Sequence, residues 1–514
     1  MKKTLARSAA LMGIVILLSK VMGLVRDSMV ASAYGTTAAA IAYETASKLP
    51  ITIFDFVLGG VVTSAFIPVY NSLAVKKGKQ EALAFAQSYV NLILVITLSL
   101  SVIGILFAPA LVSFIAPELE ASTAALAASL TRIMFPMVIF VGLAFSFVGF
   151  LQSEGEYNIP AVISLVSNLI MVGYLLFLNV SFGITGLAVS MLLGWGAQAA
   201  VQIPAVMKRG FRYRLNAPLI TPETARAAKN TLPILIATWT TPVCTLINTR
   251  IASGIDEGRA IGALGYANRL YIIIVGLFSF VATNLLFPYF ARAAAEGNRD
   301  ESDRLTRTSI RTLTFIIAPI AAGVMVLTEQ FVALIYENGF FSASDTAITA
   351  EALRSYAVGM IFAAVGEVLT KAFFAVEKTR LPMISSVISM GFNIAVIVLF
   401  GDGLGIGGIA LVSALASGVN MLVNGIFAVR LKLITPDFSD VLDLSKSVLS
   451  AALMGIAVYF AADIPTLRET GGIIGFAVPT LIGVLAYALC TALFRSQEML
   501  SLIRAFPSKR RRFH

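Results

Sequence analysis

The chain has 514 residues, of which 58% are hydrophobic and only 13% are charged, a composition far outside the range of soluble globular proteins. The formal net charge of +10 would suit nucleic-acid binding, but the basic residues gather in short connections between apolar segments, as in membrane proteins. The single histidine, His514, excludes a histidine proton relay, a histidine metal site and Ser-His catalysis within the apolar segments. The sequence therefore predicts a polytopic helical membrane protein with no nucleic-acid partner.

About fourteen segments are apolar over the ~20 residues that a helix needs to cross a bilayer. The predicted spans are 8–34, 39–74, 84–113, 121–151, 159–180, 184–207, 229–252, 260–294, 309–335, 348–376, 382–400, 406–429, 445–463 and 472–494. The first is not a cleavable signal, because its apolar stretch is too long and is interrupted by Lys20, Arg26 and Asp27. Basic residues collect in alternate connections, so both termini are expected on the cytoplasmic side.

Two halves of the chain repeat each other at an offset of about 221 residues. Ala31-Ser32 superposes on Ala252-Ser253, and Lys48-Leu49 superposes on Arg269-Leu270. Each half holds six predicted spans, an even number, so both halves enter the membrane from the same side as a parallel repeat. The expected fold class is an all-α polytopic membrane protein with about 14 transmembrane helices, in two parallel six-helix repeats plus two extra C-terminal helices.

The repeat also predicts the domain organisation. The expected parts are an N-terminal lobe over 1–207, a cytoplasmic inter-lobe linker over 208–228, a C-terminal lobe over 229–430, two further helices over 431–495 and a basic cytoplasmic tail over 496–514. In transporters built from repeats, the substrate binds between the repeated parts. We therefore expect the binding site between the two lobes.

Basic residues outnumber acidic ones inside the predicted spans. The eight basic residues are Lys20, Arg26, Lys48, Arg132, Arg250, Arg269, Arg354 and Lys371, and the four acidic residues are Asp27, Glu44, Asp55 and Glu367. A charge near the centre of a membrane helix costs at least about 2.5 kcal/mol unless it faces protein, water or a partner charge. The excess of positive charge predicts a cavity that receives an anion.

Five of these residues are candidates for binding the anion. Lys20 and Asp27 are seven residues apart and share a helix face, and Arg26 lies on an adjacent face. Lys48 and Arg269 are equivalent in the repeat, which predicts that they face each other across the cavity. Arginine offers forked donors and lysine a movable point charge, a combination that suits a pyrophosphate. The alternative for Arg26 and Asp27 is ion pairing with neighbouring helices.

The other charged residues in the spans have simpler interpretations. Lys48 has Glu44 four residues earlier, and Glu367 and Lys371 have the same spacing, so each pair could neutralise itself on one helix. Glu44, Asp55, Glu367 and Lys371 are the candidates for a coupling or gating role, because without histidine any proton must be carried by carboxylates. The arginines at positions 132, 250 and 354 lie near helix ends, where their side chains can reach the interface.

Several motifs resemble one known family. The run from Ser19 to Asp27, the tripeptide Lys48-Leu49-Pro50 and the run Ser64–Pro68 are similar to the first two helices of the MurJ (MviN) lipid II flippases. The run Ala267–Leu270 is similar to their helix 8. The likeness covers nearly the whole chain, including the two extra helices. The chain is thereby identified as resembling a member of the MOP exporter superfamily.

The resemblance implies a flippase that moves undecaprenyl-pyrophosphate-linked peptidoglycan precursor, lipid II, from the cytoplasmic to the outer leaflet by alternating access. It implies that Arg26 and Arg269 line the central cavity and hold the pyrophosphate, accompanied by Asp27. Lys20 stands where the family usually has arginine. The helices of 431–495 would supply a groove for the lipid tail. The implied location is the bacterial inner or plasma membrane, and cell-wall synthesis machinery is a further expected partner.

The sequence departs from the family at two places. A family basic pair falls near Phe54-Asp55, which reverses the charge, and Ile41 replaces a residue that is commonly acidic. No Gly-rich phosphate loop appears, so direct use of ATP is not expected. Neither a cofactor nor a metal is expected. A site for a coupling cation is not legible either, since Asn393 has no carboxylate one turn away. Membrane potential or an ion gradient would drive transport.

Three other functions remain open from the sequence. The first is another MOP-type exporter, of a polyprenyl-linked O-antigen or polysaccharide unit or of a drug, although a cavity for cationic drugs should be negative. The second is a membrane enzyme such as a polyprenyl-phosphate glycosyltransferase, which would need clustered carboxylates or metal ligands. The third is a scaffold that transports nothing, which would leave the buried cations without a role. We expect a transporter and not an enzyme.

Overall fold

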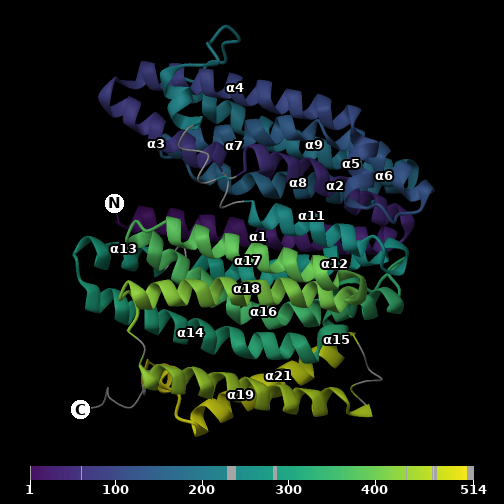
Figure 1. Ribbon diagram of the computed structural model, residues 1–514, viewed down its shortest axis with the longest axis vertical. Helices are drawn as coiled ribbons and strands as arrows, with labels where there is room; N and C mark the ends of the chain where they lie inside the picture. Colours follow the sequence, from purple (N-terminus) through teal and green to yellow (C-terminus); the bar gives the residue numbers. More distant parts are fainter. Residues whose placement is uncertain are drawn as a thin grey trace. The chain divides into compact units, whose positions relative to one another are not determined.

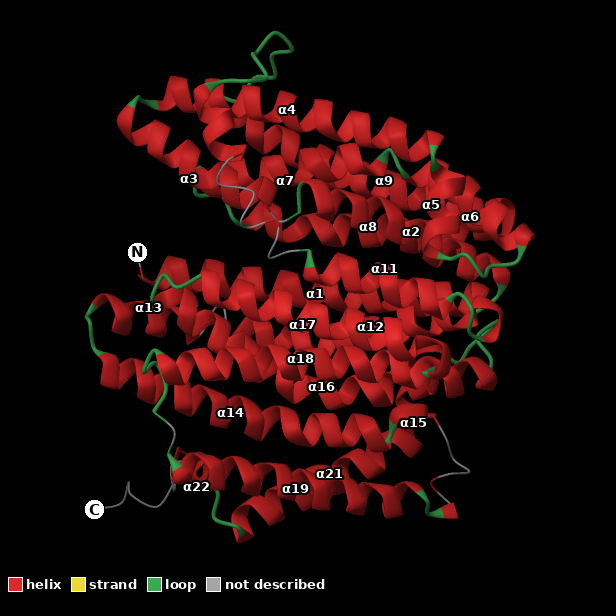
Figure 2. Cartoon of the chain, viewed as in Figure 1, coloured by secondary structure: helices red, strands yellow, loops and turns green. Residues whose placement is uncertain are grey.

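The computed structural model describes residues 2–59, 61–228, 235, 239–281, 286–435, 437–465, 467 and 472–505 (Figure 1). Within these residues every regular element is helical, and none is a strand (Figure 2). The prediction of an all-α membrane fold is confirmed. Of the predicted tail, residues 506–514 lie outside the described part.

The helices follow one another with short connections. In the first part of the chain they are α1 (Lys2–Tyr34), α2 (Ala38–Val57), α3 (Val61–Lys76), α4 (Lys79–Leu106), α5 (Ala108–Ile115), α6 (Ala121–Met134), α7 (Met137–Ser153), α8 (Asn158–Phe177), α9 (Asn179–Lys208), α11 (Thr240–Ala252) and the 3-10 turn η1 (Asp256–Gly258). The second part contains α12 (Arg259–Val281), α13 (Phe287–Ala295), α14 (Arg299–Val326), α15 (Thr328–Tyr336), α16 (Ala343–Ala375), α17 (Arg380–Phe400), η3 (Gly401–Gly403), α18 (Gly405–Arg430), α19 (Phe438–Ala462), α21 (Gly472–Leu493) and α22 (Gln497–Ala505).

Thirteen of the fourteen predicted spans correspond to one helix or to two consecutive helices among the described residues, and the described part of the span 229–252 contains α11. Among the described residues, nine single helices are long and apolar enough to cross a membrane, and α6 with α7 forms a tenth candidate that is bent by 40°. The other four predicted spans, 8–34, 39–74, 229–252 and 260–294, include residues whose side chains lie outside the described set. These four spans also carry seven of the nine charged residues that the sequence analysis singled out as site candidates.

The longest predicted span, 39–74, is two helices and not one. The first ends at Val57, and Gly59 has a φ of 46°, a left-handed conformation that glycine adopts without a Cβ penalty. The indole Nε1 of Trp239 donates a hydrogen bond of 2.9 Å to the carbonyl oxygen of Phe56, in the last turn of α2. A carbonyl at a helix end lacks an intrahelical partner, so this bond stabilises the break between α2 and α3.

The chain divides into two compact units by packing. Unit 1 contains residues Met1–Gly262 together with Asn338–Phe341, and its helices pack as the pairs α8–α9, α7–α9, α1–α8 and α2–α6. Its core includes a set of aromatic rings around Phe66, whose centroid lies 5.4 Å from Tyr70, 5.4 Å from Phe85 and 5.2 Å from Tyr89. Such ring contacts add to the hydrophobic stabilisation of α3 against α4.

Unit 2 contains residues Ala263–Glu337 and Ser342–His514. Its helices α16 and α18 approach so closely that a Cβ added at Gly359 would lie 2.9 Å from the Cα of Ala414, the small-residue packing that membrane helices use. The helices α19 and α21 pack on α14 through a buried cluster that includes Leu327, Met454 and Tyr487. The two helices after the repeats are therefore part of unit 2.

Packing and sequence repeat place one helix differently. The predicted C-terminal lobe begins at residue 229, whereas unit 1 extends to Gly262 and so includes α11. The physical reason is that α11 packs against α2 and α5, and the Arg250 guanidinium donates to the carbonyl oxygen of Phe114. The lobe boundaries derived from the repeat stay a prediction, because a sequence relationship need not coincide with a packing boundary.

Candidate functional site

Arg26 and Asp27 form a polar cluster on α1 within unit 1. The Arg26 Nε and Nη2 atoms donate to the Asp27 Oδ1 atom at 3.0 and 2.8 Å, and Nη1 donates to Asn168 Oδ1 on α8 at 2.8 Å. The Asp27 side chain is only 6% exposed and that of Arg26 is 26% exposed. These bonds use three of the five N–H donors of a guanidinium, so two remain for an anion.

Asn168 is a site residue that the sequence analysis missed. Its Nδ2 atom donates to the carbonyl oxygen of Ser19 at 3.1 Å, so this one amide contacts α1 at both Ser19 and Arg26. A Cβ at Gly23 would lie 3.5 Å from the same Nδ2 atom, which explains how α8 approaches α1 here. The available signal was an amide near the middle of an apolar span, since buried amides in membrane helices form interhelical hydrogen bonds.

Lys20 and the α2 candidates also lie in unit 1. Lys20 is half-buried on α1, Glu44 is 2% exposed, and Lys48 and Asp55 are partly buried. Pro50 lies within the same helix, between Lys48 and Asp55. Burying a carboxylate as deeply as Glu44 requires interactions that compensate for its desolvation. The roles predicted for these four residues stay predictions.

Arg269 lies on α12 in unit 2, over an aromatic pair. Its guanidinium carbon is 5.6 Å from the centroid of the Tyr266 ring, within the range of a cation–π interaction. Tyr266 is fully buried and its ring lies 5.1 Å from that of Tyr336. The aromatic surface packs against the arginine side chain and holds it in place.

The self-neutralising pair predicted for Glu367 and Lys371 is confirmed on α16. The Lys371 Nζ atom lies 3.2 Å from the Glu367 Oε1 atom, four residues away on α16. The same Nζ atom is 5.6 Å from the centroid of the Phe374 ring. Arg354, another basic residue of the spans, donates to the carbonyl oxygen of Met325 at 3.2 Å and pairs with Glu329 at 3.4 Å.

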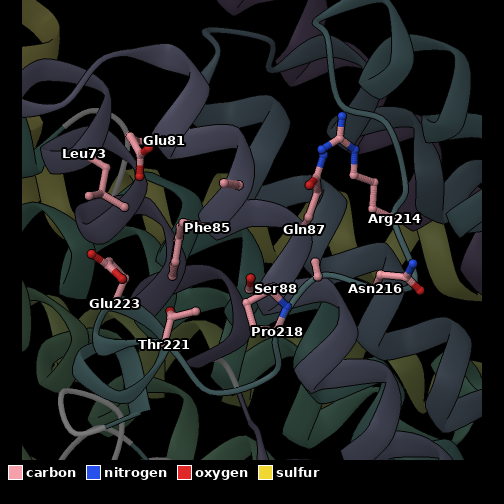
Figure 3. A pocket seen from close by; sticks show the side chains of 12 residues that line it. Leu73, Glu81, Phe85, Gln87, Ser88, Arg214, Asn216, Pro218, Thr221 and Glu223 are labelled. Atoms are coloured by element: carbon pink, nitrogen blue, oxygen red, sulfur yellow. The ribbon is translucent and has the colours of Figure 1, made fainter.

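A cleft of about 490 Å³ lies in unit 1 between α3, α4 and the connection after α9 (Figure 3). None of the nine candidate residues lines it. Beside it, Lys77 donates to Glu223 at 3.1 Å, and this hydrogen bond lowers the pKa of the Glu223 carboxyl. Asn91 on α4 donates to the carbonyl oxygens of Arg214, Leu215 and Ala217. The cleft is thus bounded by the predicted linker, which α4 holds through its side chains.

A second polar cluster of unit 1 lies where α7 ends. Glu154 accepts hydrogen bonds from Lys79 and Tyr70, both at 2.7 Å, and Arg209 pairs with Glu156 at 2.6 Å. Burial alone would raise the pKa of Glu154, but the two hydrogen bonds and the charges of Lys79 and Arg209 outweigh it and lower that pKa. These bonds join α3, α4 and the turn after α7.

The described residues contain no metal-binding cluster of acidic, histidine and cysteine side chains. No group of three or more His, Cys, Asp or Glu side chains in that part of the chain is placed to hold a metal ion. The polar side chains of the candidate site are arginines, lysines, an asparagine and carboxylates, of which Asp27 and Glu367 pair with basic residues.

Comparison with known proteins gives consistent matches. The family model described as "Lipid II flippase MurJ" matches residues 30–494. A Rhizobium meliloti protein named "Probable lipid II flippase MurJ" is 31% identical over 469 residues, covering 90% of this chain and 87% of that protein. A Thermotoga maritima protein of the same name is 25% identical and covers 98% of both chains.

Two solved structures share the fold. One, described as lipid II flippase MurJ in an inward closed conformation, has a TM-score of 0.82 at 24% identity and covers 96% of this chain and 100% of its own. An inward-facing multidrug resistance MATE family transporter of the MOP superfamily has a TM-score of 0.68 at 14% identity, covering 83% and 98%. At these identities the likeness concerns the fold alone.

Proposed function

The chain belongs to the lipid II flippase MurJ family, and from this premise we propose that it moves lipid II from the cytoplasmic to the outer leaflet by alternating access. The observation that carries the proposal is the family match, which extends over nearly the whole chain, from residue 30 to residue 494. The protein is a multi-pass membrane protein of a transporter family, so its substrate is a lipid with a large anionic head group. Moving that head group across hydrocarbon requires a polar site within the membrane.

Arg26 and Arg269 are proposed to hold the pyrophosphate of the substrate. Asp27 and Asn168 orient Arg26 by three hydrogen bonds and leave donors for phosphate oxygens. Tyr266 orients Arg269 through its ring. Lys20 and Lys48 add positive charge, which suits a ligand that carries at least two negative charges. The support for this arrangement is the chemistry of the side chains in each unit.

The remaining parts of the proposal concern energy, orientation and partners. Membrane potential or an ion gradient drives the cycle, without cofactor, ATP or catalysed reaction, and Glu44 and Asp55 are the carboxylates to test for coupling. Both termini lie in the cytoplasm of a bacterium, with the protein in the inner or plasma membrane. Helices α19 and α21 receive the lipid tail. Cell-wall synthesis enzymes would use the substrate on the outer side.

The test is complementation of a bacterium depleted of its own flippase. Exposure of lipid II to an external probe is measured for the wild type, Arg26→Ala, Arg269→Ala and the control Arg354→Ala, an arginine in a span that pairs with Glu329. We expect the wild type and the control to restore exposure of lipid II. At equal expression, Arg26→Ala and Arg269→Ala should each expose at least tenfold less lipid II than the wild type. A correctly inserted wild type that fails in two hosts would overturn the substrate, and another polyprenyl-linked lipid would be tested next.

A further inference from the structure

Four exposed basic residues gather at one end of unit 2, where α16 ends, α17 begins and α18 ends. This basic cluster consists of Lys378, Arg380, Arg430 and Lys432. An apolar cluster brings the two connections together, because Phe373 in the last turn of α16 packs with Ala428 in the last turn of α18 and with Leu433 after it. The helices α16, α17 and α18 also pack side by side (Figure 1). The two connections therefore carry their positive charges at the same end of unit 2.

The side chains of the basic cluster have no partner within the described part of the chain, where none of the four forms an ion pair or a side-chain hydrogen bond. On neighbouring helices of unit 2, by contrast, Arg304, Arg311 and Lys446 each pair with a carboxylate, at 2.8, 2.8 and 3.0 Å. The one acid next to the cluster in sequence, Glu377, offsets a single charge of the four. The remaining like charges repel one another unless an anion joins them.

The sequence repeat identifies the counterpart of the basic cluster in unit 1. At an offset of 222, Gly155 falls on Glu377 and Gly210 falls on Lys432. All four residues have a positive φ, of 78° and 59° in the first pair and of 95° and 55° in the second. The two halves of the chain therefore form the same two turns, after α7 and α9 in unit 1 and after α16 and α18 in unit 2.

The charges on these turns differ between the two units. In unit 1 the first turn carries Glu154 and Glu156, and Glu156 pairs with Arg209 at the end of α9 at 2.6 Å. The same offset places Val376 and Lys378 at these two acidic positions in unit 2. Unit 2 thus keeps the turns and the basic residues but lacks the carboxylates that neutralise them. An anion from outside the chain can take their place, and the N-terminal end of α17 also favours an anion there.

Exposed aliphatic side chains lead along α17 and α18 to the basic cluster. On α17, Ile384 and Ile388 follow Arg380 at intervals of four residues and are 39% and 45% exposed. On α18, Leu422 and Ile426 lead at the same interval to the basic residue at the end of the helix and are 59% and 52% exposed. Residues four apart share a helix face, so each aliphatic row ends in a cation. A complementary ligand joins an anionic group to aliphatic chains, as a membrane phospholipid does.

We propose that the basic cluster binds the phosphate of an anionic phospholipid whose acyl chains lie along α17 and α18. The forked guanidinium groups of Arg380 and Arg430 and the ammonium groups of Lys378 and Lys432 donate to the phosphate oxygens. The inference rests on the proposed function only for the leaflet, since that orientation places the cluster at the cytoplasmic side. A lipid that binds the folded protein at this place stabilises unit 2 by mass action.

The first experiment measures the affinity of phosphatidylglycerol for the purified full chain by native mass spectrometry. Phosphatidylcholine with the same acyl chains is the comparison lipid, because its head group has no net charge. Two variants of equal net charge are compared with the wild type. The cluster variant combines Lys378→Gln, Arg380→Gln, Arg430→Gln and Lys432→Gln, and the control combines four exposed residues of unit 1 as Lys208→Gln, Arg212→Gln, Arg214→Gln and Arg226→Gln.

We expect phosphatidylglycerol to bind the cluster variant at least tenfold more weakly than the wild type, and the control variant less than twofold more weakly. Phosphatidylcholine should bind all three proteins equally. Equal losses in the two variants would show that only net charge matters and would overturn the site. The site also fails if phosphatidylglycerol binds the wild type no more tightly than phosphatidylcholine.

The second experiment supplies the carboxylate that unit 1 has. Lys378→Glu reproduces Glu156 at the equivalent position, so the new carboxylate should neutralise the remaining cations from within the chain. The control for charge loss is Lys378→Gln. The measurement is the rise of the thermal unfolding midpoint when phosphatidylglycerol is added. We expect a rise in the wild type, a smaller one in Lys378→Gln and none in Lys378→Glu, and an undiminished rise in Lys378→Glu would contradict the inference.

Two further outcomes separate this site from other anion sites. Displacement of phosphatidylglycerol by excess inorganic phosphate would assign the cluster to a free anion and overturn the lipid. A tenfold loss of phosphatidylglycerol binding in Arg26→Ala, with none in the cluster variant, would place the lipid at the proposed substrate site instead. Neither experiment uses lipid II, so a failed complementation test would remove the proposed substrate and leave the lipid site to be decided by these measurements.

Discussion

Two arginine–carboxylate clusters in this molecule look similar in composition and differ in what they join. Arg26 on α1 contacts one carboxylate and one amide, so only α1 and α8 are joined and two donors remain. Arg311 on α14 contacts Asp440 at 2.8 Å and Glu498 at 3.1 Å, which joins α14 to α19 and α22. Arg26 thus joins two helices through one carboxylate and one amide, whereas Arg311 joins three helices through two carboxylates, which is why we propose a ligand for the first cluster and a structural role for the second.

The difference has a physical origin in where the clusters lie along their helices. Arg311 and Arg307 are in the first half of α14, near the starts of α19 and α22, and both contact Asp440. Several acids converge there, so each of these arginines forms ion pairs with more than one carboxylate. The Arg26 cluster lies in an apolar segment, where Arg26 pairs with the adjacent Asp27. Desolvation there favours a further anion, because a buried guanidinium gains from each charge-assisted bond.

The largest effect is expected from the α1 cluster. Arg26→Lys keeps the positive charge but removes the forked guanidinium, which donates hydrogen bonds to both Asp27 and Asn168. We expect external exposure of lipid II to fall about tenfold, with a thermal unfolding midpoint close to that of the wild type. Asn168→Leu, which removes the orienting amide, should give a smaller loss of the same kind. Unfolding midpoints that fall in parallel with activity would show that the α1 cluster is structural as well.

The next effect concerns the α14 cluster and the stability of unit 2. Arg311→Ala leaves Asp440 and Glu498 buried without this cation, and breaking a buried ion pair costs about 3 kcal/mol. We expect a clearly lower unfolding midpoint, while the protein that stays folded exposes lipid II at a normal rate. The control is Arg304→Ala, which removes a solvent-exposed pair with Glu301 and should leave the midpoint unchanged. Normal stability of Arg311→Ala would contradict the structural role.

A smaller effect is expected at the end of α7, where acid pH should weaken unit 1. The pKa of Glu154 is lowered in the folded state, so its contribution is present above the ordinary value of 4.5 and is lost as pH falls through the lowered pKa. Glu154→Gln should remove on the order of 1 kcal/mol at neutral pH and flatten the decline of the unfolding midpoint below pH 4.5. An unchanged pH profile would show that the Lys79 and Tyr70 bonds do not stabilise the fold.

The smallest effect is expected from the ion pair of Glu367 and Lys371, which lies within a predicted span and whose two charges cancel. A double-mutant cycle with Glu367→Ala and Lys371→Ala should give a coupling energy of about 0.3–0.5 kcal/mol, as for other i, i+4 pairs. Flipping should stay above half of the wild-type rate in the double variant. If flipping is lost while the unfolding midpoint stays normal, the pair has a role in coupling and the structural interpretation is wrong.

The sequence predicted some of these clusters and missed others for a common reason. Glu367 and Lys371 are neighbours on one helix, so helical spacing alone predicts their contact, and the structure confirms it. Asn168 contacts Arg26 although the two residues are 142 positions apart in the chain. No local sequence pattern can therefore predict this contact. The carboxylates around Arg311 likewise come from helices more than a hundred residues further along the chain.

By itself, the sequence determined the class of the protein, because the length and frequency of its apolar segments admit only membrane helices. It also determined the repeat and the candidate residues Arg26, Asp27 and Arg269, through charges that hydrocarbon does not tolerate without a role. The tertiary structure alone decided that the span 39–74 breaks at Gly59, that α11 packs with unit 1, and that Phe340 meets Ser32. These features depend on contacts between distant segments, whose energies are set by packing and not by local composition.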